Sequence, residues 1–462
     1  MQSLSSNHFR PPKSALTKIG IQESRAVSPA KRSSAPKIAY IVSGFPNLYE
    51  TFILYDILTM EKLGVGVELY PLRRQYPRVV HPEAERWTKL AHFRPFLSFS
   101  VLRAQWHFIR RDPLGYLKLL AEVCQGTWGS ANFFLGAVAI FPKSVLFALQ
   151  MSTQGISHVH AHFANHPAVA ALIIHRLTGI PFSFTARGSD VQVDRQMLKE
   201  KVDAAQFVIA VSSDNKQIMV DECGPSVSKK IHVIYGGVDV DRLSPHFAGP
   251  SAGPLKILCV ARLEEVKGHT YLVEACRILR ERGVAFECRM VGDGPLFKQI
   301  EMQIKQSGLG KQVQLVGPLG YQEVIKEMSR ADVLVLQTAP TAQGDREGIP
   351  NVLKEAMACG LPVVACGVGG IPELVDHERT GILVALKNSD ALADSLQRLY
   401  EDSALRNQLG RAGREKIVQE FNLKTSTTKR ASLFLGAPVP HDSLPTGHNE
   451  KSLFEINARQ SA

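Results

Sequence analysis

Short apolar runs alternate with helical patterns along most of the chain. The first run, residues 38–42, is rich in β-branched residues and is followed by a turn at 43–46. Apolar residues then recur at helical spacing over residues 50–63, and a second apolar run follows at 65–70. This strand–turn–helix–strand order predicts the start of a parallel α/β sheet.

The same rhythm returns after residue 158 and again after residue 255. The strand-like runs in these two stretches are 181–185, 207–211 and 232–234, then 256–260, 285–291, 313–316, 333–336, 362–365 and 382–384. We therefore expect an α/β fold with two doubly wound domains of similar size that face each other. Because ligands bind at the carboxyl ends of the strands in such sheets, we expect the site in the cleft between the domains.

Chain length and the positions of the strand and helix patterns give the expected domain limits. A chain of 462 residues corresponds to two or three domains. Residues 1–36 and 436–462 are expected to be disordered tails. Between them we expect an N-terminal domain at 37–236 with a basic helical insertion at 73–151, a linker at 237–254, a C-terminal domain at 255–414 and a final helix at 415–435.

The insertion carries most of the excess charge. The chain has 54 Lys and Arg against 43 Asp and Glu, a formal net charge of +11, and residues 73–118 alone hold ten basic and three acidic residues, a net charge of +7. Aromatic residues are interleaved with the basic ones. Two interpretations stay open: a solvated insertion packed on the sheet, or an amphipathic surface that rests on anionic lipid. A nucleic-acid surface is disfavoured because no nucleic-acid-binding motif accompanies the charge.

Several features favour a cytoplasmic protein, either soluble or peripheral on the cytoplasmic membrane face. The seven cysteines are scattered without a C-x-x-C pair, which argues against a disulfide framework or a zinc site. The N-terminal segment lacks the apolar core of a secretory signal. The longest apolar stretch, 133–151, is interrupted by Pro142 and Lys143, so we expect it to be too short to span a membrane.

Two charged motifs in the second half indicate a ligand with a diphosphate. Glu347 and Glu355 are eight residues apart and flank a helix start that follows a Gly-Ile-Pro turn. A helix N-terminus offers N–H groups to an anion, and the two carboxylates can accept hydrogen bonds from sugar hydroxyls on either side. Arg262 and Lys267 follow the first strand of this half, and their cationic groups suit a diphosphate. Each motif alone is equally typical of a solvated loop or helix.

In the first half, residues 184–190 follow a strand and direct polar groups, among them Arg187 and Asp190, toward the expected cleft. Three histidines alternate and therefore share one face of a strand: His158, His160 and His162. No carboxylate or cysteine is adjacent to them, so we expect a polar strand end rather than a metal site. The Asp-x-Asp pattern at 239–241 lies in the linker and is a weak metal signal, and no metal is expected.

Together these elements resemble the family-4 retaining glycosyltransferases of GT-B fold, which has two Rossmann-like domains. The resemblance spans roughly residues 37–435 and rests on Arg-x4-Lys-Gly at 262–268 and Glu-x7-Glu at 347–355. The segment 231–239 at the domain junction and Gly292-x-Gly294-Pro295 are also shared. The motif at 45–53, with His-Ala-His-Phe-Ala at 160–164, is similar to the colanic-acid and exopolysaccharide branch.

The resemblance implies a donor site in the C-terminal domain and an acceptor site on the N-terminal side, with the final helix crossing back to the N-terminal domain. Arg262 and Lys267 would hold the donor diphosphate, Glu355 the ribose, and Glu347 the hydroxyls of the donor sugar. Backbone N–H groups around Gly348 and Ile349 would assist, and Gly44 would bind the donor by letting the first-domain loop approach the phosphates closely. Further cleft residues would be His162, Asp190 and Gly294. The nucleotide diphosphate sugar is a co-substrate, and no cofactor, metal or nucleic acid is implied.

Arg187 departs from the family pattern, in which a His at this position contacts the donor sugar near the reacting carbon. Arginine is a poor general base, but it can stabilise negative charge on the leaving diphosphate. Front-face transfer with the leaving group as base does not need that His. We therefore expect Arg187 and Glu347 to be catalytic.

The expected function is transfer of a hexosyl group, with retention, to a lipid-linked or saccharide acceptor in polysaccharide or cell-envelope biosynthesis. The alternative, motivated by Arg187, is a catalytically weak sugar-nucleotide-binding partner of a polysaccharide assembly complex. A nucleotide-sugar epimerase of the same fold is the third interpretation.

Overall fold

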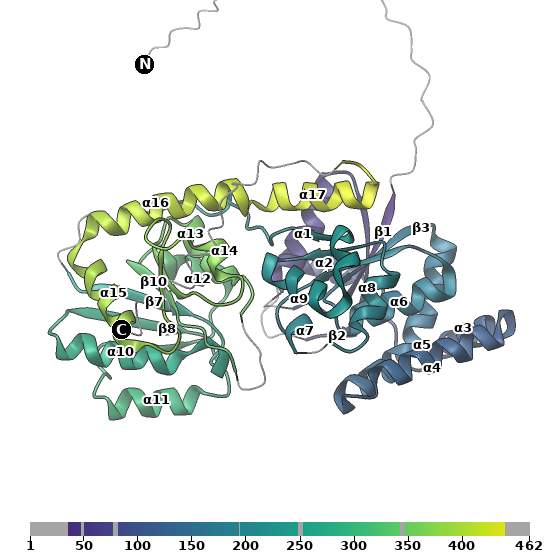
Figure 1. Ribbon diagram of the computed structural model, residues 1–462, viewed down its shortest axis with the longest axis horizontal. Coiled ribbons are helices and arrows are strands. Elements are labelled where there is room, and N and C mark those ends of the chain that lie inside the picture. Colours follow the sequence, from purple (N-terminus) through teal and green to yellow (C-terminus); the bar gives the residue numbers. More distant parts are fainter. Residues whose placement is uncertain are drawn as a thin grey trace, which may run out of the picture. The chain divides into compact units, whose positions relative to one another are not determined.

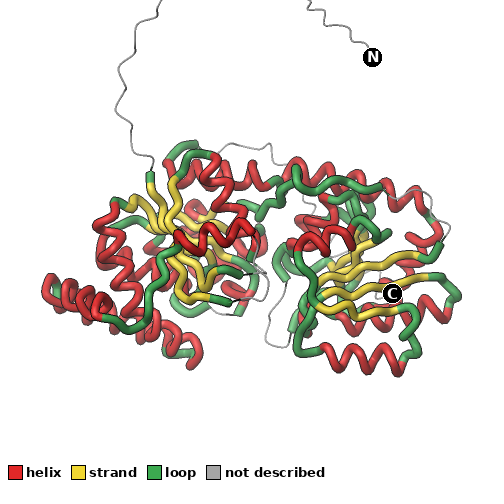
Figure 2. The backbone as a smooth tube through the Cα atoms, turned by 180° about the vertical axis from the view of Figure 1, so that it is seen from behind, coloured by secondary structure: helices red, strands yellow, loops and turns green. Residues whose placement is uncertain are grey.

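The computed structural model describes residues 36–47, 50–76, 82–193, 195–247, 253–341 and 347–438. The expected tails up to residue 35 and from residue 439, and the linker residues 248–252, lie outside these ranges. The described chain from Pro36 onward forms one compact unit in which two sheets are each covered by helices (Figure 1, Figure 2).

The N-terminal sheet has six parallel strands in the order β2-β1-β3-β4-β5-β6. They are β1 (Lys37–Phe45), β2 (Gly66–Arg74), β3 (Ile156–His162), β4 (Phe182–Ala186), β5 (Phe207–Ala210) and β6 (Ile231–Val233). Helices α1 (Thr51–Lys62), α6 (His166–Thr178), α7 (Ser189–Gln192), α8 (Leu198–Ala204) and α9 (Ser213–Cys223) connect or cover them. Every strand pair is parallel because a helix or the helical insertion crosses over between successive strands.

The insertion after β2 consists of four helices, α2 (Pro82–Leu90), α3 (Phe99–Arg111), α4 (Pro113–Thr127) and α5 (Ala131–Gln154). The side chains of Ser98, Asp112 and Ser130 cap α3, α4 and α5 by accepting from backbone N–H groups.

The expectation that the apolar stretch is too short to span a membrane is wrong as to length, because α5 continues through Pro142 and Lys143 for 24 residues. The buried Lys143 ammonium donates to the Leu72 carbonyl at 2.6 Å and lies 4.2 Å from the centre of the Phe96 ring. By length and composition α5 is able to cross a membrane, but more than half of its most apolar part is buried inside the domain.

The C-terminal sheet also has six parallel strands, in the order β12-β11-β10-β7-β8-β9. They are β7 (Leu255–Val260), β8 (Phe286–Val291), β9 (Val313–Gly317), β10 (Val333–Leu336), β11 (Val363–Cys366) and β12 (Ile382–Val384). The helices are α10 (His269–Glu281), α11 (Phe297–Gln306), α12 (Tyr321–Met328), α13 (Asn351–Ala358), α14 (Ile371–Leu374), α15 (Ser389–Glu401) and α16 (Ser403–Glu420). The prediction of an α/β fold with two doubly wound domains is confirmed.

One expected helix, 415–435, is instead the end of α16 followed by a separate helix, α17 (Leu423–Leu435). The break has a physical cause: Val238 of the linker pairs with this point of the chain, donating to the Phe421 carbonyl and accepting from Leu423 N–H, both at 2.9 Å. Asn422 then caps α17 through its side chain.

Helix α17 packs on α1 of the N-terminal domain (Figure 1). Arg430 of α17 forms an ion pair with the buried Asp56 of α1. The carboxylate of Asp56 also accepts from Thr427 at 3.0 Å and from the Tyr40 hydroxyl at 2.9 Å. This buried cluster fixes the C-terminal end of the described chain to the first domain.

Candidate functional site

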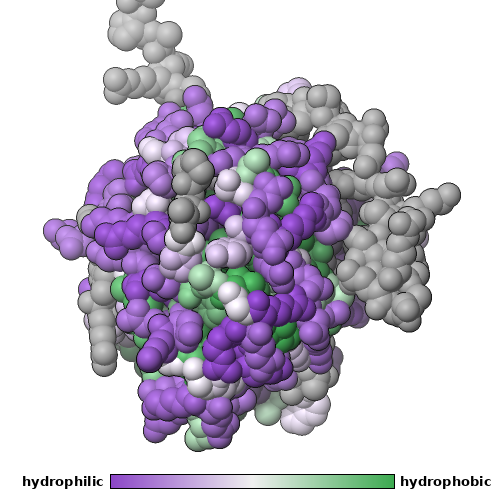
Figure 3. Space-filling model, turned by 90° about the vertical axis from the view of Figure 1, so that its left-hand side faces the viewer, coloured by the Kyte–Doolittle hydropathy of each residue, from purple (hydrophilic) through white to green (hydrophobic). Residues whose placement is uncertain are grey.

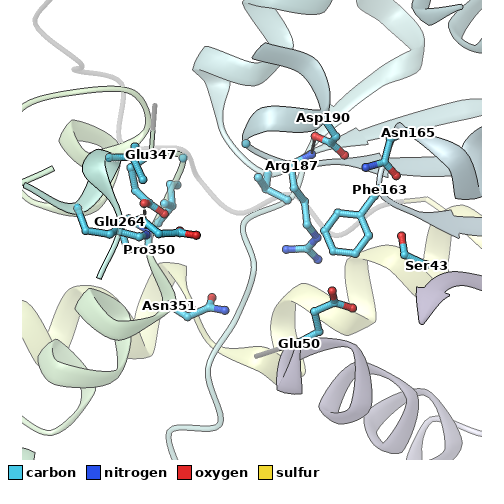
Figure 4. Close-up of a pocket in the computed structure, with 16 residues that line it drawn as sticks. Ser43, Glu50, Phe163, Asn165, Arg187, Asp190, Glu264, Glu347, Pro350 and Asn351 are labelled. Atoms are coloured by element: carbon cyan, nitrogen blue, oxygen red, sulfur yellow. Dashed lines mark hydrogen bonds and ion pairs between the residues drawn. The ribbon is translucent and has the colours of Figure 1, made fainter. Parts of the chain in front are cut away.

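A pocket of about 430 Å³ lies between residues that follow strands of the two sheets. Its N-terminal-domain lining is Ser43, Glu50, Phe163, Asn165, Arg187, Gly188, Asp190 and Val211, and its C-terminal-domain lining is Glu264, Val266, Lys267, Glu347, Gly348, Ile349, Pro350 and Asn351. Figure 4 shows the two groups of side chains on opposite sides of an open space. The pocket is therefore at the carboxyl ends of the strands, where the doubly wound fold places ligands.

On the C-terminal side, the structure brings together Lys267 and Glu347, which are 80 residues apart in sequence. Their side chains form an ion pair and are 19% and 18% exposed. Gly369 packs against the Glu347 carbonyl, and a Cβ atom at Gly369 would lie 2.0 Å from that oxygen. The loop that carries Glu347 is therefore held from behind by a glycine that no larger residue can replace.

Arg262 is placed differently from Lys267. Its guanidinium forms an ion pair with Glu264 at 2.8 Å, is 56% exposed, and does not line the pocket. Gly294 packs on the backbone of the same loop, since a Cβ atom there would lie 2.6 Å from the Leu263 carbonyl oxygen. Gly294 therefore supports the loop and is not itself among the lining residues. Gly44 lies in β1 against the Gln75 side chain, next to the lining residue Ser43.

Helix α13 begins at Asn351 with its first turn at the pocket, because Gly348 to Asn351 all line it. The N–H groups of this turn and the helix dipole favour an anion there. Glu355 lies about one turn further along α13, and burial raises its pKa to about 7. Burial raises the pKa of the neighbouring Tyr321, and the negative charge of Glu355 raises it further.

Lys354, next to Glu355, is a residue that sequence analysis did not single out. It is 2% exposed and donates from Nζ to the Gly236 carbonyl at 2.5 Å. Burial, with the nearby Arg187 charge, lowers its pKa to about 7. Its position on a helix gave no sign of this, because only the tertiary structure brings the domain junction over it.

On the N-terminal side, Arg187 and Asp190 both line the pocket, and the Asp190 side chain contacts the Arg187 backbone. The Asp190 carboxylate accepts from the backbone N–H groups of Ala164 and Arg187, both at 2.6 Å, and burial raises its pKa to about 7. The Arg187 guanidinium lies 4.1 Å from the centre of the Phe52 ring. Burial lowers the pKa of Arg187 to about 10, so the side chain stays cationic at neutral pH.

Glu50 is the second residue without an assigned role in the sequence analysis, although it lies in the motif at 45–53. Figure 4 shows the Arg187 guanidinium pointing toward Glu50 on the same side of the pocket. Burial raises the pKa of Glu50 to about 7, and its Oε2 atom has no hydrogen-bond partner in the described structure. A carboxyl group with a pKa near neutrality at a pocket is suited to proton exchange.

The three alternating histidines lie on one face of β3, as their spacing predicts, but they are buried. His158 and His160 hydrogen-bond to the hydroxyl of Ser183, at 2.6 and 2.8 Å. His162 packs edge-on against Tyr40, is 1% exposed and does not line the pocket; burial keeps its pKa well below the ordinary value. In the described ranges, no group of three or more ligand side chains is arranged to hold a metal ion.

Glu373 of α14 joins the two domains beside the pocket. Its carboxylate accepts from the N–H groups of Ser213 and Asp214, at 2.8 and 3.2 Å, where α9 begins, and from the Tyr235 hydroxyl at 3.0 Å. A carboxylate is favourable at a helix N-terminus, so this contact holds the domains in the observed arrangement.

Comparison with known proteins gives a consistent assignment for both domains. Residues 129–242 match the model of "Glycosyltransferase Family 4", and residues 245–416 match "Glycosyl transferases group 1". WcaL of Salmonella typhimurium, a glycosyltransferase assigned to colanic acid biosynthesis, is 30% identical over 86% of this chain and 99% of its own. AmsK of Erwinia amylovora, an amylovoran biosynthesis glycosyltransferase, is 39% identical over 42% of this chain and 48% of its own.

Solved structures show the same fold at low sequence identity. A glycosyltransferase from Rickettsia africae aligns with a TM-score of 0.66 and 19% identity over 87% of this chain and 98% of its own. Anabaena HepE in complex with UDP-glucose aligns with a TM-score of 0.63 and 19% identity over 87% of this chain and 99% of its own.

Proposed function

The chain belongs to the family-4 glycosyltransferases of GT-B fold, in the exopolysaccharide-biosynthesis branch, and from this membership we propose a donor, a mechanism and an acceptor for it. The donor is a nucleotide diphosphate sugar, as in the HepE complex with UDP-glucose. A hexosyl group is transferred with retention to a lipid-linked or saccharide acceptor. The reaction takes place in the cytoplasm, at the membrane face where lipid-linked acceptors are found.

The observation that carries this proposal is the Lys267–Glu347 ion pair beside the N-terminus of α13. A donor diphosphate at this position has the helix N-terminus and the Lys267 ammonium as its partners. Glu347 then exchanges its ion pair for hydrogen bonds to hydroxyls of the donor sugar, with the N–H groups of Gly348 and Ile349 assisting. Glu355, one turn along α13, accepts from the ribose. Arg262 exchanges its ion pair with Glu264, itself a lining residue, for the diphosphate.

Arg187 stands across the pocket from these groups and supplies a permanent positive charge. In a front-face transfer the leaving diphosphate gains negative charge as the glycosidic bond breaks, and a nearby cation stabilises that charge. The diphosphate itself takes the acceptor proton, so Arg187 need not act as a base. The mechanism requires no metal or cofactor.

The test combines binding with turnover. A thermal-shift panel of UDP-, GDP-, ADP- and TDP-sugars identifies the donor, because a ligand that binds the folded state raises the melting temperature. Donor hydrolysis and transfer are then measured for the wild type and for Glu355→Ala, with the exposed Glu301→Ala of α11 as the matched control. Equal activity of wild type and Glu355→Ala contradicts the assigned site.

A second function, a catalytically weak sugar-nucleotide-binding partner, is favoured by one observation, the cation at position 187. Arg187→His restores the residue usual in the family. If this variant gains no turnover while both proteins bind the nucleotide tightly and neither transfers sugar, the binding-partner function is supported and transfer is rejected.

A further inference from the structure

The surface of the insertion is unusually apolar. Eleven of the twenty large apolar side chains that are exposed in the described part of the chain lie between residues 96 and 138. Outside this segment, only Tyr76 among the described residues has a large apolar side chain more than 60% exposed. The far end of the C-terminal domain is, by contrast, covered mainly by hydrophilic residues (Figure 3). An apolar concentration of this kind marks an interaction site.

Helix α3 has apolar residues on two opposite faces. Val101, Ala104 and Phe108 are buried against the domain. The opposite face, with spacings of three and four residues, carries Phe99, Leu102, Trp106 and Ile109, which are 83%, 63%, 63% and 36% exposed. The domain therefore covers only one of the two apolar faces of α3.

Helix α4 repeats this arrangement. Its buried face consists of Tyr116, Leu119, Val123 and Thr127. Leu114 and Leu117 on the other face are 79% and 60% exposed, and Trp128 at its end is 75% exposed. Because the buried faces of α3 and α4 pack on α5, the exposed faces point away from the fold, and Figure 1 shows both helices at the outer end of the N-terminal domain.

Basic residues accompany the exposed apolar faces. Arg103 and Arg110 are seven residues apart and lie beside the apolar stripe of α3, with Arg111 at the end of the helix. None of the three forms an ion pair with any residue that the structure describes. The nearby acids have other partners: Asp112 accepts from Gly115 N–H at 2.9 Å, and Glu122 pairs with Arg176 at 3.0 Å. The surface is therefore both apolar and positively charged.

We propose that the exposed faces of α3 and α4 form a docking surface for an anionic lipid bilayer. Apolar side chains on such a face enter the boundary of the acyl chains while the arginines contact headgroup phosphates. A second copy of the chain is a poorer occupant, because a two-fold pairing of this face would bring its unpaired arginines against one another. The inference extends the proposed function, because a lipid-linked acceptor, one of the two acceptor types proposed, lies in a membrane.

The test is flotation of the full chain with vesicles of phosphatidylcholine, with and without phosphatidylglycerol. We expect binding to the mixed vesicles that falls as salt is added. Replacing Arg103, Arg110 and Arg111 together by Gln should reduce the partition coefficient on the order of 100-fold, because each cation near an anionic surface contributes a factor of about five. The matched control, with the exposed Lys298, Lys305 and Lys311 of the C-terminal domain changed to Gln, should bind as the wild type does.

A second variant, Leu102→Ser with Trp106→Ser, tests the apolar face, with the exposed Met302→Ser of α11 as its control. We expect an unchanged melting temperature and at least tenfold weaker vesicle binding. The proposal is overturned if both surface variants bind like the wild type, if neutral vesicles bind equally well, or if the Ser variant instead abolishes a dimer seen without lipid. A donor-induced thermal shift measured on the same proteins separates the two proposals, since its absence counts against the proposed function and not against the docking surface.

Discussion

The ion pair between Lys267 and Glu347 predicts that removing either partner changes the affinity for a diphosphate differently. Without a donor, the Lys267 ammonium is neutralised by the Glu347 carboxylate, and both are mostly buried. A bound diphosphate must compete with that carboxylate for the same cation. Removing the cation should therefore weaken diphosphate binding, whereas removing the competing charge should not.

The magnitude follows from the type of contact. A hydrogen bond to a charged group contributes about 1.5–3 kcal/mol, so Lys267→Met should raise the Kd for the nucleoside diphosphate on the order of 10- to 100-fold. Glu347→Gln should bind the nucleoside diphosphate at least as tightly as the wild type. The same variant should lose part of the extra affinity for the sugar nucleotide, because the neutral amide of Gln accepts from sugar hydroxyls more weakly than the carboxylate does.

Isothermal titration calorimetry of the nucleoside diphosphate and of the corresponding sugar nucleotide measures all these values at one ionic strength. Lys298→Met, an exposed change in α11, is the control for loss of a positive charge in the same domain. The reasoning is refuted if Glu347→Gln weakens diphosphate binding as much as Lys267→Met does. Such a result would mean that the ion pair only holds Lys267 in place and that the two anions do not compete.

Further predictions concern stability. Burial raises the pKa of Glu355 from 4.5 to about 7, so the folded state binds more protons than the unfolded state between these pH values. The wild type should therefore lose stability as the pH rises from about 4.5 to 7. Melting temperatures of Glu355→Gln should fall less steeply over this range, and equal slopes would contradict the assignment. Arg430→Met leaves the buried carboxylate of Asp56 without its cation, which should lower the free energy of unfolding by about 3–5 kcal/mol. Amide hydrogen exchange in α17 should then be faster, whereas the exposed change Lys424→Met should leave the exchange rate unchanged. Gly294→Ala should lower stability by about 1–3 kcal/mol through overpacking, measured by urea unfolding, while Gly310→Ala, where a Cβ atom meets nothing within 4 Å, should not.

The sequence alone determined the two-domain α/β architecture. Strands such as β10 (Val333–Leu336) and β12 (Ile382–Val384) begin and end where their apolar runs do, because buried parallel strands are continuous apolar segments between turn residues. The positions of the charged motifs were also predictable, since loops after parallel strands lead into the site. The role of each residue in donor binding remains a prediction.

Tertiary structure decided what local patterns do not encode. The break between α16 and α17 arises from pairing with a linker residue nearly 200 positions earlier. Lys143 of α5 is buried and donates to a carbonyl of β2, a partner 71 residues away in the sequence. The raised pKa values of Glu50 and Glu355 and the lowered one of Lys354 exist only because the fold removes these groups from water. Local spacing thus determined most strands and helices. Burial and long-range pairing, which depend on the assembled chain, determined the helix break at 421–422 and the pKa values of the buried ionisable groups.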